Sequence, residues 1–592
     1  MSRLTAPCRM SRHGSIGTLL TAALVAVASG GVFASPAADV MQTGFTARIT
    51  LDLHGITSDE PLYEAGPLHL AVRMAGKTKA LEEYDRHLGN YLNFPLPDGS
   101  CPVIEATMGG LRVGIPLGLL ERSDCVHEAT VNLARTHFSI SLDGHVDDDM
   151  FSQPTFAADL DARKVLSQRV KAARLSVPSL PDAMGRVPDF RPIERSVQYW
   201  TPSDHNAWVG DVAPGVFGGR LHVFYLYDRR HHHSKSRAGG LFFAHMSSGD
   251  LVRWDEHPIA VPLDEWWTTE GTGTPFVMDG KLCLAYGLHT SRITNDPAYP
   301  IGGTYAESSD GVHFTKTMKI ITDAQNPSIC NLPGGGFELV TSYGGTKGIF
   351  RSGRLGDWKL FDCALPFRGD CPSLFGWRGH RYLLQGFTRM AYSPNGAPGT
   401  FADWSDAPDV AYEGLSVPMV VPWRNDRRLY IGWLAHPAGW GGWLVFRELV
   451  AYPDGHLGLK WVPEIMPPIP PVTFRAGKGE RFSRRFVSDR SGAALVLTVD
   501  PVTHTASFAD DAANVRLTPP HKAGNFRIGG LRCIDGDYEV KIVAWHDRKA
   551  DVTIFDVEIG GERTMICRRI GRYRLKSEWP ERPKPAIFLT PS

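Results

Sequence analysis

Between residues 191 and 468 the chain repeats one local pattern: a turn of small residues with Asp or Gly, then an aromatic residue that opens the next strand. The pattern occurs at Ser247–Trp254, at Ser308–Phe314 and at Arg354–Trp358. Helical periodicity is almost absent there, and weak repetition at this spacing is typical of a β-propeller. We expect about five blades of four strands, because a blade takes roughly 40–50 residues.

The repeated region is flanked by two stretches that also alternate in the manner of strands. A chain of 592 residues is too long for one hydrophobic core, so several domains are expected. We predict an all-β protein with a signal peptide at 1–34, an N-terminal β-sandwich of jelly-roll or lectin-like type at 42–185, a five-bladed propeller at 190–468 and a C-terminal β-sandwich at 474–592. The strand predictions outside the propeller are Phe45–Leu51, Leu68–Arg73, Thr136–Leu142, Ala493–Val499 and Tyr538–Ala544. A helix-like patch is expected at 158–173, before a linker that contains Pro178 and Pro181.

The N-terminus has the composition of a targeting segment. Arg3, Arg9 and Arg12 precede an apolar run from Thr18 to Val32, and a small-residue cleavage site follows near Ala34. This order predicts a secretory signal and a secreted or periplasmic protein, with no membrane span after signal removal. An uncleaved anchor is the alternative for this segment.

Charge and cysteine content restrict the partners. The 63 basic and 63 acidic side chains cancel, so nothing points to nucleic acid. Nine cysteines include Cys8 of the signal, and Cys101 with Cys125 or Cys533 with Cys567 are possible disulfides whose connectivity the sequence does not decide.

Two clusters invite a metal interpretation that we do not adopt. Asp147–Asp149 lacks a full calcium ligand spacing, which favours a solvated acidic loop. His231–His233 lacks Cys neighbours or ordered spacing, so a loop near the pocket is the better interpretation. We expect neither a metal nor a cofactor.

The stretch Trp208-Val209-Gly210-Asp211 precedes a Gly-rich turn and the apolar strand Leu221–Asp228. Asp211 is then either a turn residue before a hairpin or a carboxylate held at the rim of a strand. A retaining glycosidase needs two carboxyl groups about 5–5.5 Å apart. A propeller can supply them from separate blades, whose inner strands converge on a central funnel.

Ordered blocks from residue 190 onward resemble glycoside hydrolase family 32, the invertase, inulinase and levanase group. Trp208–Asp211 resembles the family's W-M-N-D, Ala244–Ala260 its G-H-A-x-S-x-D-L block, and Gly369–Phe375 its E-C-P-D-L-F. Further blocks in the family's order are Glu270–Thr274, Leu429–Trp433 and Arg447–Leu449. The resemblance implies Asp211 as the nucleophile and Asp370 as the acid/base.

The sequence departs from the family pattern at two of these positions. Asp370 stands where the family has Glu, and Asn326 of Gln325-Asn326-Pro327 stands where the family's R-D-P has Asp. Glu270 could compensate for the lost charge as a catalytic or sugar-binding group, or be a rim residue paired with Arg; for Asp323, three residues before Asn326, a structural role is favoured. The expected substrate-binding residues are Asn326, Glu270, Trp208, Trp266, Thr272 and Trp433.

These residues predict an exported enzyme that cleaves fructofuranosyl or related furanosyl linkages of an oligo- or polysaccharide with retention. One alternative is a shifted furanoside specificity, for an arabinofuranoside or a fructose dianhydride. Another is a non-catalytic carbohydrate-binding propeller. The sequence leaves open the oligomeric state, exo or endo action and the role of the N-terminal sandwich.

Overall fold

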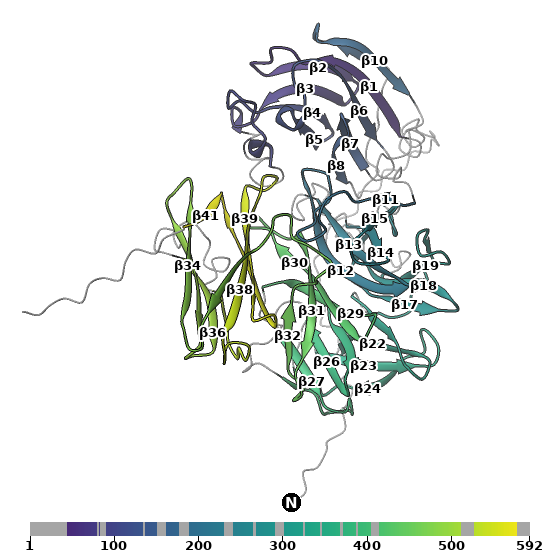
Figure 1. The fold of residues 1–592 in the computed structure, drawn as a ribbon. Coiled ribbons are helices and arrows are strands. Elements are labelled where there is room, and N and C mark those ends of the chain that lie inside the picture. Colours follow the sequence, from purple (N-terminus) through teal and green to yellow (C-terminus); the bar gives the residue numbers. More distant parts are fainter. Residues whose placement is uncertain are drawn as a thin grey trace, which may run out of the picture.

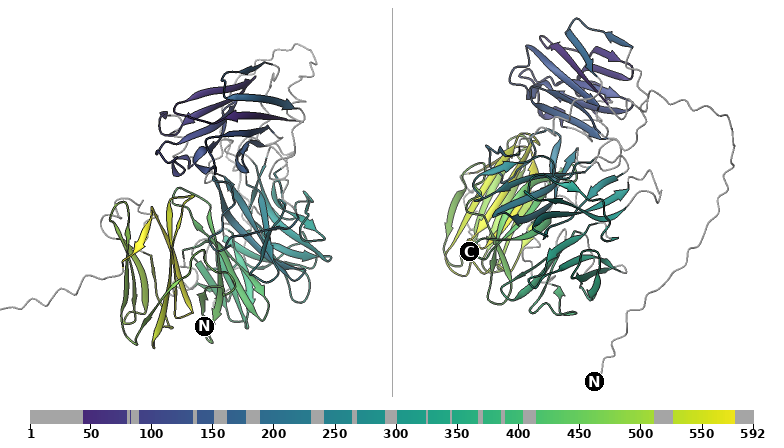
Figure 2. Two further views of the ribbon diagram at one scale, coloured as in Figure 1. Left: turned by 45° about the horizontal axis from the view of Figure 1, so that its top comes forward. Right: turned by 90° about the vertical axis from the view of Figure 1, so that its right-hand side faces the viewer.

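The protein is built almost entirely from strands. The computed structural model describes residues 44–79, 82, 90–133, 137–150, 162–176, 189–229, 241–263, 268–290, 301–323, 326–343, 346–366, 371–385, 389–403, 414–510 and 526–576. Within these ranges the regular elements named β1 to β41 are strands, and two short 3₁₀ turns accompany them. This confirms the all-β prediction. Figures 1 and 2 show three units: an N-terminal sandwich, a central propeller and a C-terminal sandwich.

The N-terminal unit consists of two five-stranded antiparallel sheets. The first contains, in order, β10 (Val170–Ser176), β1 (Phe45–Asp52), β6 (Val126–Leu133), β7 (His137–Leu142) and β8 (His145–Met150). The second contains β5 (Leu111–Pro116), β4 (Pro102–Met108), β3 (Leu68–Met74), β2 (Glu60–Ala65) and β9 (Arg163–Val165). The 3₁₀ turns η1 (Tyr91–Asn93) and η2 (Leu117–Leu119) lie outside the sheets.

Alternation of the side chains explains why these segments pair. In β1 the residues Phe45, Ala47, Ile49 and Leu51 are fully buried, and they face a core shared by both sheets. Strands with one apolar face gain stability only when that face is covered by a second layer. The predicted strands at 45–51 and 68–73 are confirmed, and so is the edge hairpin at β7 and β8.

Two predictions for this unit are wrong. The helix-like patch at 158–173 forms β9 and the start of β10 in its described part, because both sheets offer an edge to which these residues pair. The acidic run Asp147–Asp149 is no solvated loop: it lies within β8, and its three side chains are at most 2% exposed. Hydrogen bonds and an ion pair from other segments supply the polar contacts that burial demands.

The propeller is formed by four sheets. The largest has β11 (Arg191–Pro192), β15 (Trp254–Glu256), β14 (Phe243–Ser248), β13 (Arg220–Arg229), β12 (Ala207–Phe217), β31 (Gly442–Ala451), β30 (Arg427–Ala435) and β29 (Ser416–Trp423), with β32 (Leu457–Lys460) beside β31. The second has β16 (Thr268–Gly271) and β17 (Pro275–Met278) beside β18 (Lys281–Thr290), then β19 (Gly302–Ser308) and β20 (Thr315–Lys316). The third has β21 (Ser328–Asn331), β22 (Phe337–Tyr343), β23 (Thr346–Ser352) and β24 (Lys359–Asp362), and the fourth has β25 (Ser373–Trp377), β26 (His380–Gln385), β27 (Arg389–Ser393) and β28 (Ala402–Asp403).

The innermost strands close a ring. Strand β12 contacts β17 and β29, β17 contacts β21, β21 contacts β25, and β25 contacts β29. The nine-stranded sheet joins the first strands of the ring to the last through the pair Val209↔Gly442. A cavity of about 480 Å³ is lined by residues of all five inner strands, β12, β17, β21, β25 and β29.

The repeated turn that the sequence indicated is a real structural repeat. Ser248 and Ser308 accept hydrogen bonds from the N–H groups of Leu251 and Gly311, at 2.8 and 2.9 Å. Asp250 and Asp310 accept two backbone N–H groups each in the same turns. The sequence reasoning missed a related turn at Ser393, which accepts the N–H of Gly396 at 2.7 Å. Each of these turns links the third strand of a four-strand group to the fourth.

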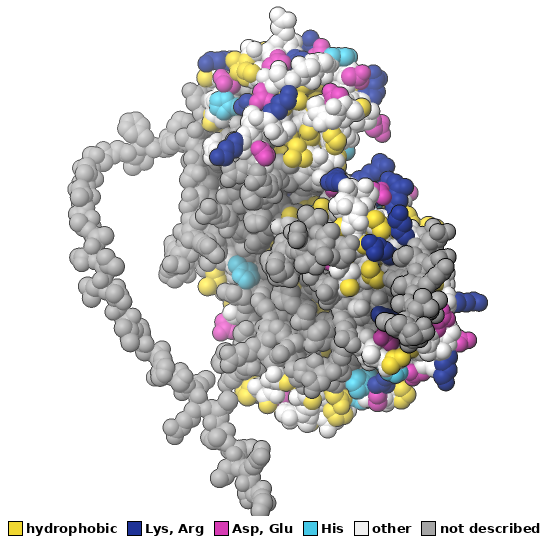
Figure 3. All heavy atoms as spheres, turned by 90° about the vertical axis from the view of Figure 1, so that its left-hand side faces the viewer, with side chains coloured by type: hydrophobic (Ala, Val, Ile, Leu, Met, Phe, Trp, Pro, Cys, Tyr) yellow, Lys and Arg dark blue, Asp and Glu magenta, His cyan; other side chains and the backbone are white. Residues whose placement is uncertain are grey.

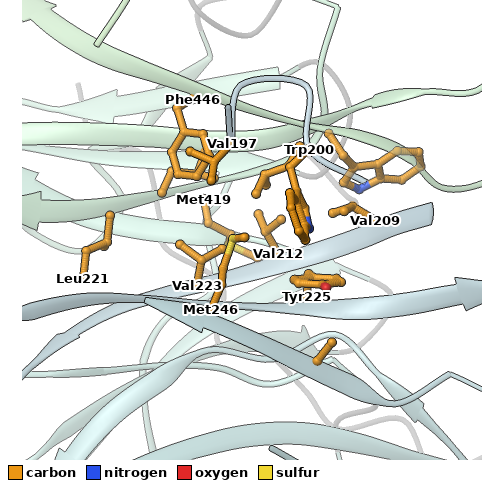
Figure 4. Close-up of a cluster of buried hydrophobic side chains, with 14 of the residues drawn as sticks. Val197, Trp200, Val209, Val212, Leu221, Val223, Tyr225, Met246, Met419 and Phe446 are labelled. Carbon is orange, nitrogen blue, oxygen red and sulfur yellow. The ribbon is translucent and has the colours of Figure 1, made fainter. Parts of the chain in front are cut away.

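Packing between the first and last groups of strands locks the ring. Val209, Val212, Val223, Met246, Met419 and Phe446 are among the side chains that fill this space, with Trp200 and Tyr225 beside them (Figure 4). Their burial removes a large apolar area from water, which is the main favourable term in folding.

The C-terminal unit is a second sandwich. One sheet has β33 (Val472–Ala476), β38 (Tyr538–Asp547), β39 (Val552–Ile559) and β40 (Arg563–Ile570). The other has β37 (Phe526–Ile528), β36 (Thr505–Asp510), β35 (Ala494–Asp500), β34 (Phe482–Ser488) and β41 (Tyr573–Leu575). The strands predicted at 493–499 and 538–544 are confirmed. Propeller and sandwich share a core that contains Trp208, Trp443 and Ile554.

Neither of the two disulfides considered is present. All eight cysteines of the described residues are free thiols. The Cys101 thiol donates to the carbonyl of Tyr91 at 2.7 Å, and the Cys125 thiol contacts His127 Nε2 at 3.0 Å. The Cys533 thiol donates to the carbonyl of Ile559 at 3.3 Å. These sulfur atoms are thus directed to other partners.

Three stacked histidines are buried in the first blade. His222 Nδ1 lies 3.0 Å from His245 Nε2, and the rings of His245 and His257 are 4.4 Å apart. Burial and, next, the charge of His257 lower the pKa of His222 to about 4. Burial also lowers the pKa of His245 and His257.

These histidines should make the propeller sensitive to acid. Their pKa is lower in the folded chain than the unfolded value of about 6.5, so between pH 4 and pH 6.5 the unfolded chain binds more protons. The free energy of unfolding therefore falls as pH falls through this window. His222→Gln should remove up to about 1.4 kcal/mol per pH unit of that slope, measured by urea denaturation followed by Trp fluorescence. His380→Gln, at an exposed histidine, is the control, and equal slopes in both variants would contradict the account.

Candidate active site

Asp211 lies where strand β12 leaves its regular ladder. The register with β13 shifts between Val209 and Val212, so Gly210 and Asp211 form a bulge. A bulge redirects a side chain and is common next to functional sites. Gly210 also lets the ring of Trp440 approach, because a Cβ there would lie 2.1 Å from it. The turn interpretation of Asp211 is wrong: the residue lies within strand β12 and is 6% exposed.

Three other parts of the ring supply donors to this carboxylate. Trp433 Nε1, on β30, donates to Asp211 Oδ1 at 3.1 Å. The Thr272 hydroxyl donates to Oδ2, and the Cys371 thiol lies 3.6 Å from the same oxygen. The Cys371 thiol is also 3.4 Å from the Thr272 hydroxyl. Hydrogen bonds to the charged form of a carboxylate stabilise the anion.

Local backbone features place two of these donors. Thr272 occupies the break between β16 and β17, where Gly273 passes so close to the next strand that a Cβ would lie 1.7 Å from the Ala285 carbonyl oxygen. Cys371 precedes β25 and has φ +51°, a left-handed conformation that is rare for a side chain of this type. Such strain gathers at functional sites. The sequence analysis gave Cys371 no role of its own; its position directly after Asp370 was the available signal.

Asn326 lies close to Gly271, the residue that directly precedes Thr272 of this cluster. A Cβ on Gly271 would meet His289 Nε2 at 2.0 Å and Asn326 Oδ1 at 2.8 Å, so both side chains approach the same glycine. Asn326 is half-buried just before β21. An amide and an imidazole offer both donors and acceptors to hydroxyl groups. The sequence reasoning did not identify His289, since a lone His on a strand gives no signal.

Glu270 and Trp208 are both interior side chains. Glu270 is 2% exposed and accepts the backbone N–H of Phe243 at 3.1 Å, so it is interior and not at the rim. Trp208 is 1% exposed, with its ring 4.6 Å from His436 and 5.6 Å from Trp443. Such an enclosed indole packs against protein and presents no face to a sugar. Trp433, also 1% exposed, acts as a donor to Asp211.

Three sequence predictions lie outside the described residues: Asp370, Trp266 and the run His231–His233. Among the residues that the structure describes, no group of three or more His, Cys, Asp or Glu side chains is arranged for a metal ion. The described part of the chain also contains no helix with the length and apolarity needed to cross a membrane.

The fold and the site define a β-propeller with one carboxylate held by donors at the start of its inner strands. Residues 205–331 match the family described as Glycosyl hydrolases family 32 N-terminal domain. This segment contains Asp211, Thr272 and Asn326. The resemblance noted in the sequence is confirmed.

Individual relatives agree with the family match. The chain is 24% identical over 298 residues to a sucrose-6-phosphate hydrolase of Escherichia coli, covering 42% of this chain and 61% of the relative. It is 24% identical over 249 residues to a levanbiose-producing levanase of Bacillus subtilis, covering 37% of this chain and 45% of the levanase. The chain thus spans less than two thirds of the length of these curated relatives. Among solved structures, exo-inulinase from Aspergillus awamori has a TM-score of 0.48 at 16% identity, covering 64% of this chain and 94% of the inulinase.

The contact between Cys371 and Asp211 has a chemical consequence. A negative carboxylate beside a thiol disfavours the thiolate, which is the form that alkylating agents attack. Asp211→Asn should therefore speed alkylation of Cys371 by iodoacetamide several-fold at pH 8 under native conditions. Peptide mapping by mass spectrometry gives the rate, and Cys567, equally buried at 7%, is the internal control. Equal rates at Cys371 in both proteins would contradict the proximity.

Proposed function

We propose that the protein is an exported retaining glycoside hydrolase that cleaves fructofuranosyl or closely related furanosyl linkages. The observation that carries the proposal is the Asp211 carboxylate, which lies inside the segment that matches the family and accepts from donors of separate blades. The relatives named above act on sucrose 6-phosphate and on levan, which supports a fructose-containing substrate. Residues 1–34 support export.

In the proposed reaction Asp211 attacks the anomeric carbon, and the bond to the leaving oxygen breaks. Asp370 donates its proton to that oxygen, so the first product leaves and a glycosyl ester on Asp211 remains. Asp370 then takes a proton from water, which attacks the anomeric carbon and frees Asp211. The two inversions give net retention.

The surrounding residues have supporting roles in this proposal. Trp433 and Thr272 donate to the two carboxylate oxygens, which fixes the direction of the nucleophile before substrate binds. Preorganised geometry of this kind can contribute several kcal/mol to catalysis. Asn326 and His289 are placed to bind ring hydroxyls.

Asp211→Ala should lower kcat by roughly a thousandfold or more, because the covalent step loses its nucleophile. The assay is product analysis on sucrose, sucrose 6-phosphate, inulin, levan and arabinan. Asp255→Asn is the matched control. Asp255 is a carboxylate of the same blade, lies on the outer strand β15 and pairs with Arg220 of β13. Undiminished turnover by the Asp211 variant would refute the mechanism.

A second candidate, a furanosidase of shifted specificity, is favoured by the uncharged Asn326 beside Gly271 and His289. A well-placed charge at such a position is worth roughly a few kcal/mol of transition-state stabilisation. If the protein is a fructofuranosidase, Asn326→Asp should raise kcat/KM on sucrose by roughly tenfold or more. If it prefers another furanoside, the same variant should lose activity on that substrate. Asp323→Asn, a change at an exposed neighbour, is the control.

A further inference from the structure

The three units of the protein meet at one residue, Lys549, in the turn between β38 and β39 of the C-terminal sandwich. Its ammonium donates to the carbonyl oxygens of Pro202 at 2.9 Å and Ala207 at 2.6 Å. These two carbonyls flank the short segment that leads into β12. The ammonium also lies 4.5 Å from the centre of the Trp208 ring, within range of a favourable cation–π contact.

The N-terminal sandwich holds the same residue from the other side. Asn90 donates through its side-chain amide to the carbonyl of Lys549 at 2.9 Å and to the carbonyl of His205 at 2.7 Å. Asn93 donates to the Lys549 carbonyl at 3.1 Å. The His205 ring packs against Tyr91, with centroids 5.8 Å apart. The turn η1 is therefore fitted against both the propeller and the turn that carries Lys549.

The contacts around Lys549, Asn90 and His205 form a junction between the three units. Further buried polar contacts join the N-terminal sandwich to the first blade beside it. Asn206 donates to Asp147 Oδ1 at 3.2 Å, and Arg229 forms an ion pair with Asp148 in which both side chains are 2% exposed. Arg229 is the ladder partner of Ala207. Figure 1 shows β8 on the side of the N-terminal unit that faces the propeller. The acidic run of β8 thus pairs with the propeller, and not with solvent.

The junction adjoins the candidate active site. Ala207, whose carbonyl Lys549 holds, lies four residues before Asp211 on the same strand, β12. Between Val209 and Val212 the bulge interrupts the ladder with β13, so regular pairing does not fix Asp211 by itself. The anchored residues before the bulge therefore determine where the carboxylate lies relative to Trp433 and Thr272.

We propose that Lys549 is a positioning residue for Asp211 and that the N-terminal sandwich acts on the site by holding Lys549 in place. This inference rests on the proposed function and explains why a hydrolase of this type carries an additional N-terminal unit. Many Lys and Arg side chains lie on the surface seen in Figure 3, whereas the Lys549 ammonium is enclosed by two carbonyls and an indole. Burial lowers the pKa of Lys549 to about 7, and burial with the nearby Asp147 raises the pKa of Asp204 to about 8.

Lys549→Met tests the proposal, because Met keeps the aliphatic volume and removes the donors. We expect kcat to fall by about tenfold to a hundredfold, the size of effect that a small misplacement of a reacting group produces, while KM stays within about threefold. Lys549→Arg should recover part of kcat. Lys541→Met is the control: Lys541 lies on β38 of the same sheet, its side chain is 36% exposed, and it pairs with Glu558 on β39.

Hydrogen–deuterium exchange gives a readout that does not need activity. Amides of residues 203–212 should exchange faster in Lys549→Met than in Lys541→Met, with other inner strands unchanged. If the parent protein turns over no furanoside, the proposed function fails, yet the exchange result still tests the junction. Parent-like kcat and parent-like exchange in Lys549→Met would overturn the inference.

A second variant covers the case in which Lys549→Met does not fold. Asn90→Ala combined with Asn93→Ala removes the donors to the Lys549 carbonyl and leaves the ammonium intact. The same lowered kcat and the same faster amide exchange at residues 203–212 are expected. A folded double variant with parent values in both measurements would show that the N-terminal sandwich does not act through Lys549.

Discussion

A charged carboxylate inside a protein needs donors, and at Asp211 they come from three places around the ring. Trp433, Thr272 and Cys371 belong to segments that are far apart in sequence, and they meet only because the inner strands close. The closure depends on the sheet that joins β12 to β31 and on the core between the first and last blades. The site is therefore a property of the closed propeller, and any change that opens the ring separates Asp211 from its donors.

The two sandwiches are fastened to the propeller by buried polar contacts as well as by apolar packing. Arg447 and Asp556 form a fully buried ion pair at 2.8 Å between the last blade and the C-terminal sandwich, and Arg229 with Asp148 does the same for the N-terminal sandwich. Buried ion pairs add little net stability, but removal of one partner is costly. Such pairs fix the position of each sandwich relative to the propeller, and so relative to strand β12, which carries Asp211.

Local patterns in the sequence were sufficient for the fold class. The alternation in β1 and β35 and the repeated Ser-Asp turns depend on near neighbours along the chain, so they could be read directly. Asp147–Asp149 could not, because the partners that allow its burial, Arg229 and Asn206, lie in another unit. The same holds for the helix-like patch, which pairs with β1 and β2 more than a hundred residues away, and for Trp208, whose covering residues come from β31 and from the C-terminal sandwich.

The central claim is that Asp211 forms the covalent bond to the sugar. The most direct test is rapid acid quenching during turnover of a furanosyl substrate, followed by peptide mapping with mass spectrometry. The account predicts a peptide containing Asp211 that has gained the mass of one furanosyl residue, and its absence from the Asp211→Ala protein. Product formation with no adduct on this peptide and with inverted anomeric configuration would contradict the account.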